Sequence, residues 1–183
     1  MTDAADNNEE SELVERAALL TLLSSPPLSL SFTRIDHAPA KTVDDLHECV
    51  AAYRTASCLA VKNLFLRSKQ SGRLVLLVLA SDRTVSLNEL SITTFGHRKA
   101  DNFRFASEEL LREKLHCKQG ALNPFAIRHA AKGDGRVELW VGKELCAATH
   151  WLAHPMTNDI SLQIATSDMF KFFEHVGAKV NRL

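Results

Sequence analysis

The sequence predicts an α/β fold, with a single domain built on a mixed, twisted β-sheet flanked by helices. Helical and strand-like segments are interspersed along the chain, without the strict alternation that marks a doubly wound parallel sheet. No internal repeat and no linker interrupts the 183 residues, a length that suits one well-buried domain. Hydrophobic residues make up 45% of the chain and charged residues 24%, so a full core and a solvated surface can both form.

The first half of the chain is predicted to form two helices, a strand and a hairpin. Pro26-Pro27 stops the first helix, because proline cannot continue the backbone hydrogen-bond pattern. Thr42 caps the second helix, and Asp44 and Asp45 in its first turn favour the positive end of the helix dipole. A turn at Ser71-Gly72 joins the two apolar runs of the hairpin. The expected elements are a helix at residues 11–23, a strand at Leu28–Ile35, a helix from Thr42 to about Tyr53, and a hairpin of Leu59–Leu66 and Leu74–Ala80.

The second half is predicted to contain four short strands and two helices. Ser107 and Thr166 are the expected N-caps, and Gly177 suits the stop after the last helix. The expected strands are Phe103–Phe105, Val137–Val141, Trp151–Ala153 and Ile160–Ile164, and the helices run from Ser107 to about Leu115 and from Thr166 to about Val176.

Charge is distributed unevenly although the formal net charge is zero. Residues 1–15 hold six of the 22 acidic side chains and no Lys or Arg, so the rest of the chain has 16 acidic against 22 basic residues. We therefore expect an acidic, disordered leader at residues 1–10 and a mildly basic domain at residues 11–183. Such a domain can bind a polyanion, but its charge does not demand one.

The cysteines and the apolar segments indicate a cytoplasmic protein. Cys49, Cys58, Cys117 and Cys146 are scattered and form no CxxC pair, so reduced thiols are expected. No apolar stretch approaches the ~20 residues that span a bilayer, and the N-terminal residues do not resemble a secretory signal. We expect no membrane association.

Lys62 is the most informative residue, because it is a charge within a run that otherwise suits a buried strand. A buried ammonium without a partner is costly, so the side chain must reach water, find a partner or face a cleft. A cleft for an anionic or carbonyl ligand would explain it. The alternative is a lysine whose stem lies along a half-buried strand while its amine reaches solvent.

Two later segments could contribute to such a cleft. The Cys117–Phe125 loop contains Gly120, which permits close backbone approach, so its N–H groups could bind a carbonyl oxygen or a phosphate. His154–Asn158 places an imidazole and an amide between two strand-like pieces. The alternatives are an ordinary turn for the first segment and a surface turn for the second.

No cofactor or metal is expected. Cys146, His150 and His154 recur every four residues, which would suit zinc on a helix, but in a strand they would lie too far apart. Pro155 and the β-leaning residues around Trp151 favour a strand. The chain also lacks a GxSxG elbow, a Walker-type loop and a dinucleotide-binding glycine pattern.

Six short segments occur in an order and spacing that resemble one family. They are Asp36–Pro39, Thr42–Asp45, Val61–Arg67, Phe105–Leu110, Gly120–Phe125 and His154–Asn158. They are similar to segments of the YbaK/ProX superfamily, the aminoacyl-tRNA editing domains associated with prolyl-tRNA synthetase, from about Glu12 onward. Asn123, Gly142 and Asp159 depart from the family pattern, which bears on the choice of amino acid more than on the fold.

The resemblance implies hydrolysis of the ester that joins a wrong amino acid to the terminal adenosine of a tRNA. Ala-tRNA(Pro) is the first candidate, with cysteinyl, seryl and threonyl substrates left open. The implied catalytic residues are Lys62, Gly120 and His154, and the implied substrate-binding residues are Thr42, Asn63, Ala121, Asn123 and Asn158. The expected tRNA-binding residues are Arg67, Lys69, Arg73, Arg98, Lys99 and Arg104.

Two other functions stay open at this point. The chain could be a non-catalytic module that binds tRNA, prolyl-tRNA synthetase or a multi-synthetase assembly, with the acidic leader and residues 11–23 as docking elements. A weaker alternative is a zinc-dependent hydrolase that uses Cys146, His150 and His154.

Overall fold

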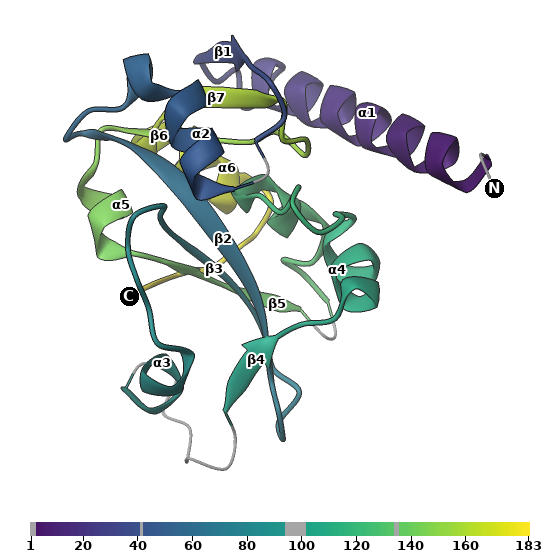
Figure 1. Cartoon of the computed structure of the whole chain (residues 1–183), viewed down its shortest axis with the longest axis vertical. Coiled ribbons are helices and arrows are strands. Elements are labelled where there is room, and N and C mark those ends of the chain that lie inside the picture. The colour runs from purple at the N-terminus through teal and green to yellow at the C-terminus, as the bar shows by residue number, and fades with distance from the viewer. Residues whose placement is uncertain (1–2, 41, 94–101, 134–135) are drawn as a thin grey trace.

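The computed structural model describes residues 3–40, 42–93, 102–133 and 136–183 (Figure 1). The first half contains α1 (Asp3–Ser24), β1 (Phe32–Asp36), α2 (Val43–Cys49), the 3-10 helix η1 (Ala51–Tyr53), β2 (Cys58–Ser68), β3 (Leu74–Ala80) and α3 (Leu87–Thr93). The second half contains β4 (Phe103–Phe105), α4 (Glu108–Leu115), the 3-10 helix η2 (Pro124–His129), β5 (Val137–Val141), α5 (Lys143–Ala147), β6 (His150–Ala153), β7 (Ile160–Ala165), α6 (Thr166–His175) and β8 (Val180–Arg182).

A mixed sheet forms the centre of the molecule, in the order β1-β7-β6-β2-β3-β5-β8, and β4 pairs with β2. The pairs β2–β6, β3–β5 and β5–β8 are parallel, and the remaining pairs are antiparallel. The predicted fold class, a mixed sheet flanked by helices in one domain, is confirmed.

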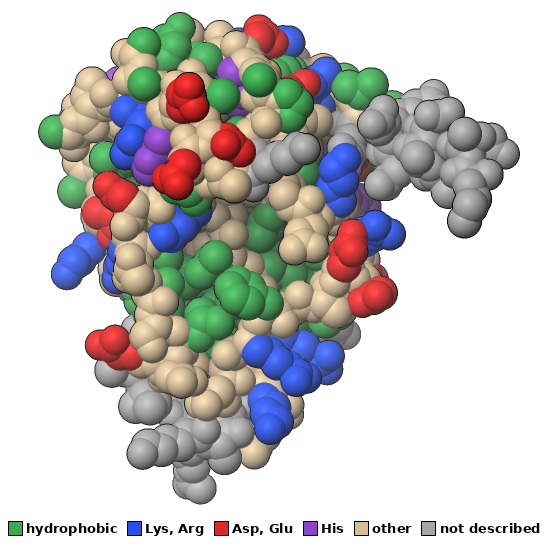
Figure 2. All heavy atoms as spheres, in the orientation of Figure 1, with side chains coloured by type: hydrophobic (Ala, Val, Ile, Leu, Met, Phe, Trp, Pro, Cys, Tyr) green, Lys and Arg blue, Asp and Glu red, His purple; other side chains and the backbone are tan. Residues whose placement is uncertain are grey.

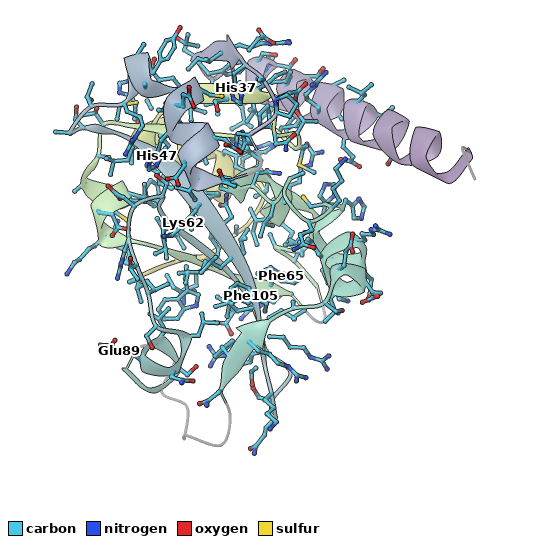
Figure 3. The ribbon with its side chains drawn as sticks, in the orientation of Figure 1. His37, His47, Lys62, Phe65, Glu89 and Phe105 are labelled. Carbon is cyan, nitrogen blue, oxygen red and sulfur yellow. The ribbon has the colours of Figure 1, made fainter. Side chains whose placement is uncertain are left out.

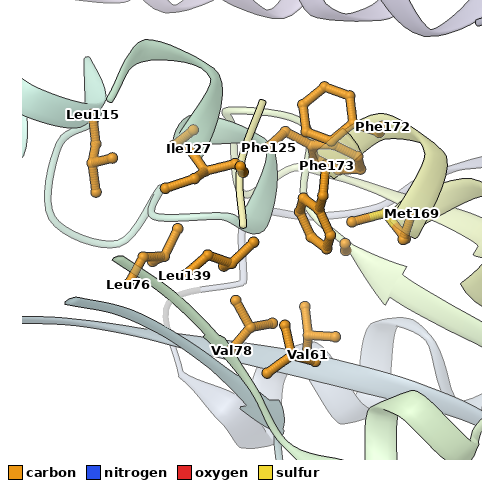
Figure 4. Packing of buried hydrophobic residues seen from close by; sticks show 14 of the residues in the cluster. Val61, Leu76, Val78, Leu115, Phe125, Ile127, Leu139, Met169, Phe172 and Phe173 are labelled. Carbon is orange, nitrogen blue, oxygen red and sulfur yellow. The ribbon is translucent and has the colours of Figure 1, made fainter. Parts of the chain in front are cut away.

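The core explains why β3 has an almost continuous apolar sequence. Both of its faces are buried: Leu76 and Val78 pack into the main cluster, while Leu77 and Leu79 belong to a second cluster on the other side of the sheet. A strand covered on both faces needs no polar alternation. Figure 4 shows the main cluster, where strand residues lie beneath side chains of η2 and α6 such as Phe125.

Two predicted caps form as expected. The Thr42 hydroxyl accepts a hydrogen bond from the Asp45 N–H at 3.1 Å, and the Asp45 carboxylate accepts from the Thr42 N–H at 2.9 Å, a reciprocal capping box. The Ser107 side chain caps α4 in the same way through the Leu110 N–H. Local sequence therefore determines where these two helices begin.

Other predicted boundaries were wrong. α1 begins at Asp3, whereas the helix was expected to begin at residue 11. β1 begins only at Phe32, and the helix expected to reach Tyr53 breaks into α2 and η1. Thr166 does not cap α6, because its hydroxyl donates to the Ala148 carbonyl at 2.7 Å. The sequence prediction also missed the short elements α3, α5 and β8.

Within the described ranges, no helix combines the length and the apolar character that crossing a membrane requires.

Candidate functional site

A gap on one edge of β2 creates the main cleft. Along its other edge, β2 pairs with β3 from Val61 to Arg67. On the cleft edge, β6 pairs only with Cys58–Ala60 and β4 only with Leu66–Ser68, so residues 61–65 have no partner strand there among the described elements. A cleft of about 430 Å³ opens at this gap, and residues 61–65 line it.

The cleft is completed by parts of the chain that are distant in sequence. Thr42, Val43 and Leu46 come from α2 and its cap, Phe105 and Glu108 from β4 and the start of α4, and Gly120, Leu122 and His154 from two loops. Figure 2 shows the opening as a hollow with hydrophobic side chains at its floor. The three predicted catalytic residues, Lys62, Gly120 and His154, thus line a single cleft.

Lys62 is held by backbone carbonyls and also faces the cleft. Its Nζ donates to the Ser81 carbonyl at 3.0 Å and to the Arg83 carbonyl, just beyond the end of β3 (Figure 3). Burial lowers the pKa of Lys62, and Arg83 lowers it further, while Asp82 and Glu144 oppose the shift. An ammonium has three N–H donors, so one remains for a ligand.

Asn63 presents an unsatisfied acceptor. Its Nδ2 donates to the Leu122 carbonyl at 3.1 Å, which fixes the amide against the loop after α4. Its Oδ1 is buried and has no hydrogen-bond partner among the described residues. A buried acceptor without a donor costs about 1–3 kcal/mol, and Asn63 lines the cleft, so its Oδ1 is a candidate contact for a bound molecule.

His154 has a defined tautomer. Its Nδ1 lies 2.9 Å from the Ile160 carbonyl, which can only accept, so the proton is on Nδ1 and the Nε2 lone pair is unprotonated. Burial lowers the pKa of His154, and His37, whose ring centroid lies 5.9 Å away, lowers it further. The imidazole is therefore neutral at pH 7 and can accept a proton.

The glycine loop offers fewer donors than the sequence suggested. Gly120 has a φ of +88° and lies at the cleft, and its N–H has no acceptor in the described part of the chain. Ala121 is buried, and its N–H donates to the Lys118 carbonyl at 3.2 Å. Gly120 therefore remains a candidate oxyanion donor. The Ala121 N–H already has an acceptor within the protein, and its role in substrate binding stays a prediction.

Two predicted substrate-binding amides have structural roles. Asn123 is fully buried; its Oδ1 accepts from the Ala126 N–H at 3.1 Å and its Nδ2 donates to the Ala121 carbonyl at 2.9 Å, which caps η2. Asn158 donates to the Ala40 carbonyl at 3.2 Å and anchors the segment before α2, outside the cleft lining. Both amides thus have hydrogen-bond partners within the protein, and their roles as substrate contacts stay predictions. Thr42 lines the cleft and caps α2.

The predicted tRNA-binding cations separate into three groups. Arg67, Lys69 and Arg104 are exposed near the end of β2 and in β4. Arg73 forms a bidentate ion pair with Glu138 at 2.8 Å, so its prediction as a tRNA contact is not supported. Arg98 and Lys99 lie outside the described residues.

The suggested zinc site does not form. Cys146 lies in α5 and His150 in β6, and with His154 they are not among the described metal-like clusters. The group that does converge joins Glu15 with one histidine that follows α4 and one in η2, a cluster the sequence prediction missed: Glu15, His116 and His129. Arg128 forms an ion pair with Glu15 there and already supplies the positive charge, which disfavours a divalent cation.

Comparisons with known proteins agree with this architecture. The model of the family described as "Aminoacyl-tRNA editing domain" matches residues 37–172. The chain is 34% identical over 149 residues to "Prolyl-tRNA synthetase associated domain-containing protein 1" of Danio rerio, covering 80% of this chain and 76% of the relative. It is 27% identical over 150 residues to "Prolyl-tRNA editing protein ProX" of Acetoanaerobium sticklandii, covering 82% and 86%.

A solved structure described as a candidate trans-editing enzyme for prolyl tRNA synthetase superposes with a TM-score of 0.63 at 16% identity, covering 92% of this chain and 96% of that one. At this identity the similarity shows the fold alone, and the fold agrees with the family match. The chain therefore belongs to the aminoacyl-tRNA editing domain family, in its YbaK/ProX-like branch.

Proposed function

We propose that this protein is a trans-acting editing deacylase that hydrolyses mischarged tRNA, with Ala-tRNA(Pro) as the first candidate substrate. The observation that carries the proposal is the convergence on one cleft of a lysine ammonium, an unsatisfied amide oxygen and a neutral imidazole: Lys62, Asn63 and His154. An aminoacyl ester offers complementary groups, namely a carbonyl, an α-ammonium and a ribose hydroxyl.

The reaction needs no protein nucleophile. Water attacks the ester carbonyl carbon, the carbonyl becomes an oxyanion, and the bond to the ribose oxygen then breaks as that oxygen takes a proton. His154 Nε2 accepts the proton of the attacking water, directly or through the neighbouring ribose hydroxyl. The Gly120 N–H and the remaining Lys62 N–H would donate to the oxyanion or to the adjacent phosphate.

Asn63 gives the cleft a means of recognising an amino acid. Its Oδ1 would accept a hydrogen bond from the α-ammonium of the aminoacyl group, which satisfies the buried oxygen only when substrate is bound. Side-chain size would then select the amino acid, and one or two methylenes give only partial discrimination. Alanyl is the smaller group and prolyl the larger.

The test is deacylation of a panel of charged tRNAs: Ala-tRNA(Pro), Ala-tRNA(Ala), Pro-tRNA(Pro), Cys-tRNA(Pro), Ser-tRNA(Pro) and Thr-tRNA(Pro). We expect the fastest hydrolysis with Ala-tRNA(Pro). Lys62→Met should reduce kcat/KM by about ten- to hundredfold, as expected for the loss of a charge-assisted hydrogen bond. Lys171→Met, which removes an exposed lysine of α6, is the matched control and should keep wild-type activity. Wild-type protein that hydrolyses no member of the panel would overturn the proposal.

A second candidate function rests on α1. This helix extends away from the rest of the molecule in Figure 1, and Leu13 and Val14 are 50% and 63% exposed. An exposed apolar pair on such a helix favours a module that docks on prolyl-tRNA synthetase or a multi-synthetase assembly. In a pull-down, purified synthetase should then capture the wild-type protein but not the double variant Leu13→Ser with Val14→Ser. Equal capture of the two proteins would exclude this contact.

A further inference from the structure

Phe105 is exposed, whereas two phenylalanines close to it are buried. Its side chain is 63% exposed, whereas Phe103 in the same strand is 3% exposed and Phe65 in the paired strand is 4% exposed. The ring also lines the main cleft. A phenylalanine side chain left in water contributes little of the stabilisation that its burial would give, so an aromatic residue at this position needs an explanation other than stability.

The position of Phe105 relates it to the proposed reaction centre. It pairs with Leu66 in the β2–β4 ladder, and Lys62 lies four residues before Leu66 on the same strand. At about 3.3 Å per residue, this separation is about 13 Å along β2. Residues an even number of positions apart along a strand have side chains on the same face, so Lys62 and Leu66 share a face of β2. Phe105, which lies opposite Leu66 in the ladder, is on that face too. Figure 3 shows Phe105 beside Phe65, further along β2 than Lys62.

The next ladder position contains a like-charge pair. Arg67 lies directly opposite Arg104 across the β2–β4 ladder, and both are exposed. Neither has a carboxylate partner among the described residues. Like charges directly opposite on neighbouring strands destabilise a sheet, unless an anion lies between them.

The arginine pair and the ring lie beside the same opening. Adjacent ladder positions point to opposite faces of an ideal pleat, but arginine side chains are long, and Figure 2 shows Lys and Arg side chains next to β4 that border the hydrophobic hollow. Glu108 is the one carboxylate among the described lining residues, and it is paired with Arg112 at 2.7 Å. The rim therefore presents an aromatic face and two uncompensated cations.

We propose that Phe105, Arg67 and Arg104 form a platform for the single-stranded 3′ end of an RNA, on which the terminal base stacks against Phe105 and its phosphate lies over the arginine pair. Single-stranded nucleic acids are bound by this combination of an aromatic platform and cations along the backbone. The proposal rests on the proposed function and deepens it, because it fixes the direction of the substrate: the base lies toward β4 and the aminoacyl ester toward Lys62 and His154.

Stacking is tested without any hydrolysis, using an uncharged RNA oligonucleotide that ends in CC followed by 2-aminopurine. Stacking quenches the fluorescence of 2-aminopurine, so binding to the wild-type protein should quench it. Phe105→Ala should abolish the quenching and raise the Kd roughly 5- to 150-fold, the range expected for one stacked base. Phe105→Trp should restore both, and Tyr53→Ala, which removes an exposed aromatic residue outside the cleft lining, should have no effect.

The arginine pair is tested by the salt dependence of the same binding. The double variant Arg67→Gln with Arg104→Gln should reduce the slope of log K against log salt by about 1.4, the value for two contacts to a single strand. Arg34→Gln, which removes an exposed arginine that pairs with Asp36, is the control. An unchanged slope would overturn the phosphate contact.

The platform and the deacylase proposal fail in distinguishable ways. Wild-type protein that hydrolyses Ala-tRNA(Pro), while Phe105→Ala binds and quenches as the wild type does, would overturn the platform alone. Quenching that depends on Phe105, in a protein without hydrolysis on any charged tRNA, would support the platform and overturn the deacylase.

Discussion

Lys62 and Asn63 are consecutive residues of one strand, yet both side chains line the same cleft. Consecutive side chains normally point to opposite faces of a sheet. Here no described strand pairs with one edge of β2, so both faces of the strand border the same opening. The missing strand neighbour thus gives the site a cation and an amide from adjacent positions.

His154 is predicted to set the acid limit of the reaction. Because burial lowers its pKa below the ordinary 6.5, the neutral, proton-accepting form persists as pH falls from 8 to 6.5. The deacylation rate, corrected for spontaneous hydrolysis, should therefore fall less in this range than it would with an imidazole of ordinary pKa, and the main loss should come at lower pH. A rate that already fell tenfold between pH 8 and 7 would contradict this assignment.

His154→Asn separates catalysis from positioning. The Asn amide can still donate to the Ile160 carbonyl in place of Nδ1–H, but it has no group at the position of Nε2. We expect kcat to fall about 10²-fold or more, as for loss of a general base, with little change in the free energy of unfolding. Loss of binding without loss of kcat would instead indicate a positioning role.

At the scale of elements, α1 is partly core and partly exposed. Leu19 and Leu23 are fully buried in the main cluster, while Leu13 and Val14 are exposed. Arg16 also links α1 to the loop before β7, through Thr157 and Asp159 at 3.3 Å. The C-terminal part of α1 is therefore integral to the domain, and deletion of residues 1–24 would remove core side chains as well as the leader.

Leu19→Ala should destabilise the protein by about 2–5 kcal/mol, because it leaves a cavity in the main hydrophobic cluster. Leu13→Ala removes the same atoms from an exposed position on the same helix and should change stability little. Urea unfolding followed by tryptophan fluorescence measures both variants. Equal stability of the two would show that α1 does not contribute to the core.

At the scale of the whole molecule, a cluster of charges joins three elements. Glu15 of α1 contacts Arg128 and His129 of η2 and lies 3.5 Å from His116 after α4. Burial, followed by the Arg128 charge, lowers the pKa of His129 to about 4. The cluster therefore makes the attachment of α1 sensitive to acid.

The sign of this effect follows from proton binding. Between pH 6.5 and about 4, the unfolded chain protonates His129 and the folded protein does not, so stability falls as pH decreases through this window. His129→Gln removes this titration and should flatten the pH dependence of the urea midpoint. His175→Gln, at an exposed position in α6, should keep the wild-type dependence. Identical curves for wild type and His129→Gln would contradict the prediction.

Sequence patterns predicted the features that depend on neighbours along the chain. The hairpin of β2 and β3, the capping of α2 by Thr42 and the stop at Gly177 were all predictable, because each follows from hydrogen bonds or burial within a few residues. The resemblance of ordered segments also identified the family, since those segments keep the residues that line the cleft.

The tertiary structure decided which polar residues already have partners within the protein and which do not. Asn63 and Asn123 are both asparagines within family-like segments, but only the pairing of elements shows that no described residue donates to the oxygen of Asn63 and that Asn123 caps η2. Arg73 and Arg67 differ in the same way. Arg73 forms an ion pair with Glu138, whereas no described carboxylate pairs with Arg67. The order of strands around β2 sets these contacts, and that order joins residues far apart in the chain, which no local pattern encodes.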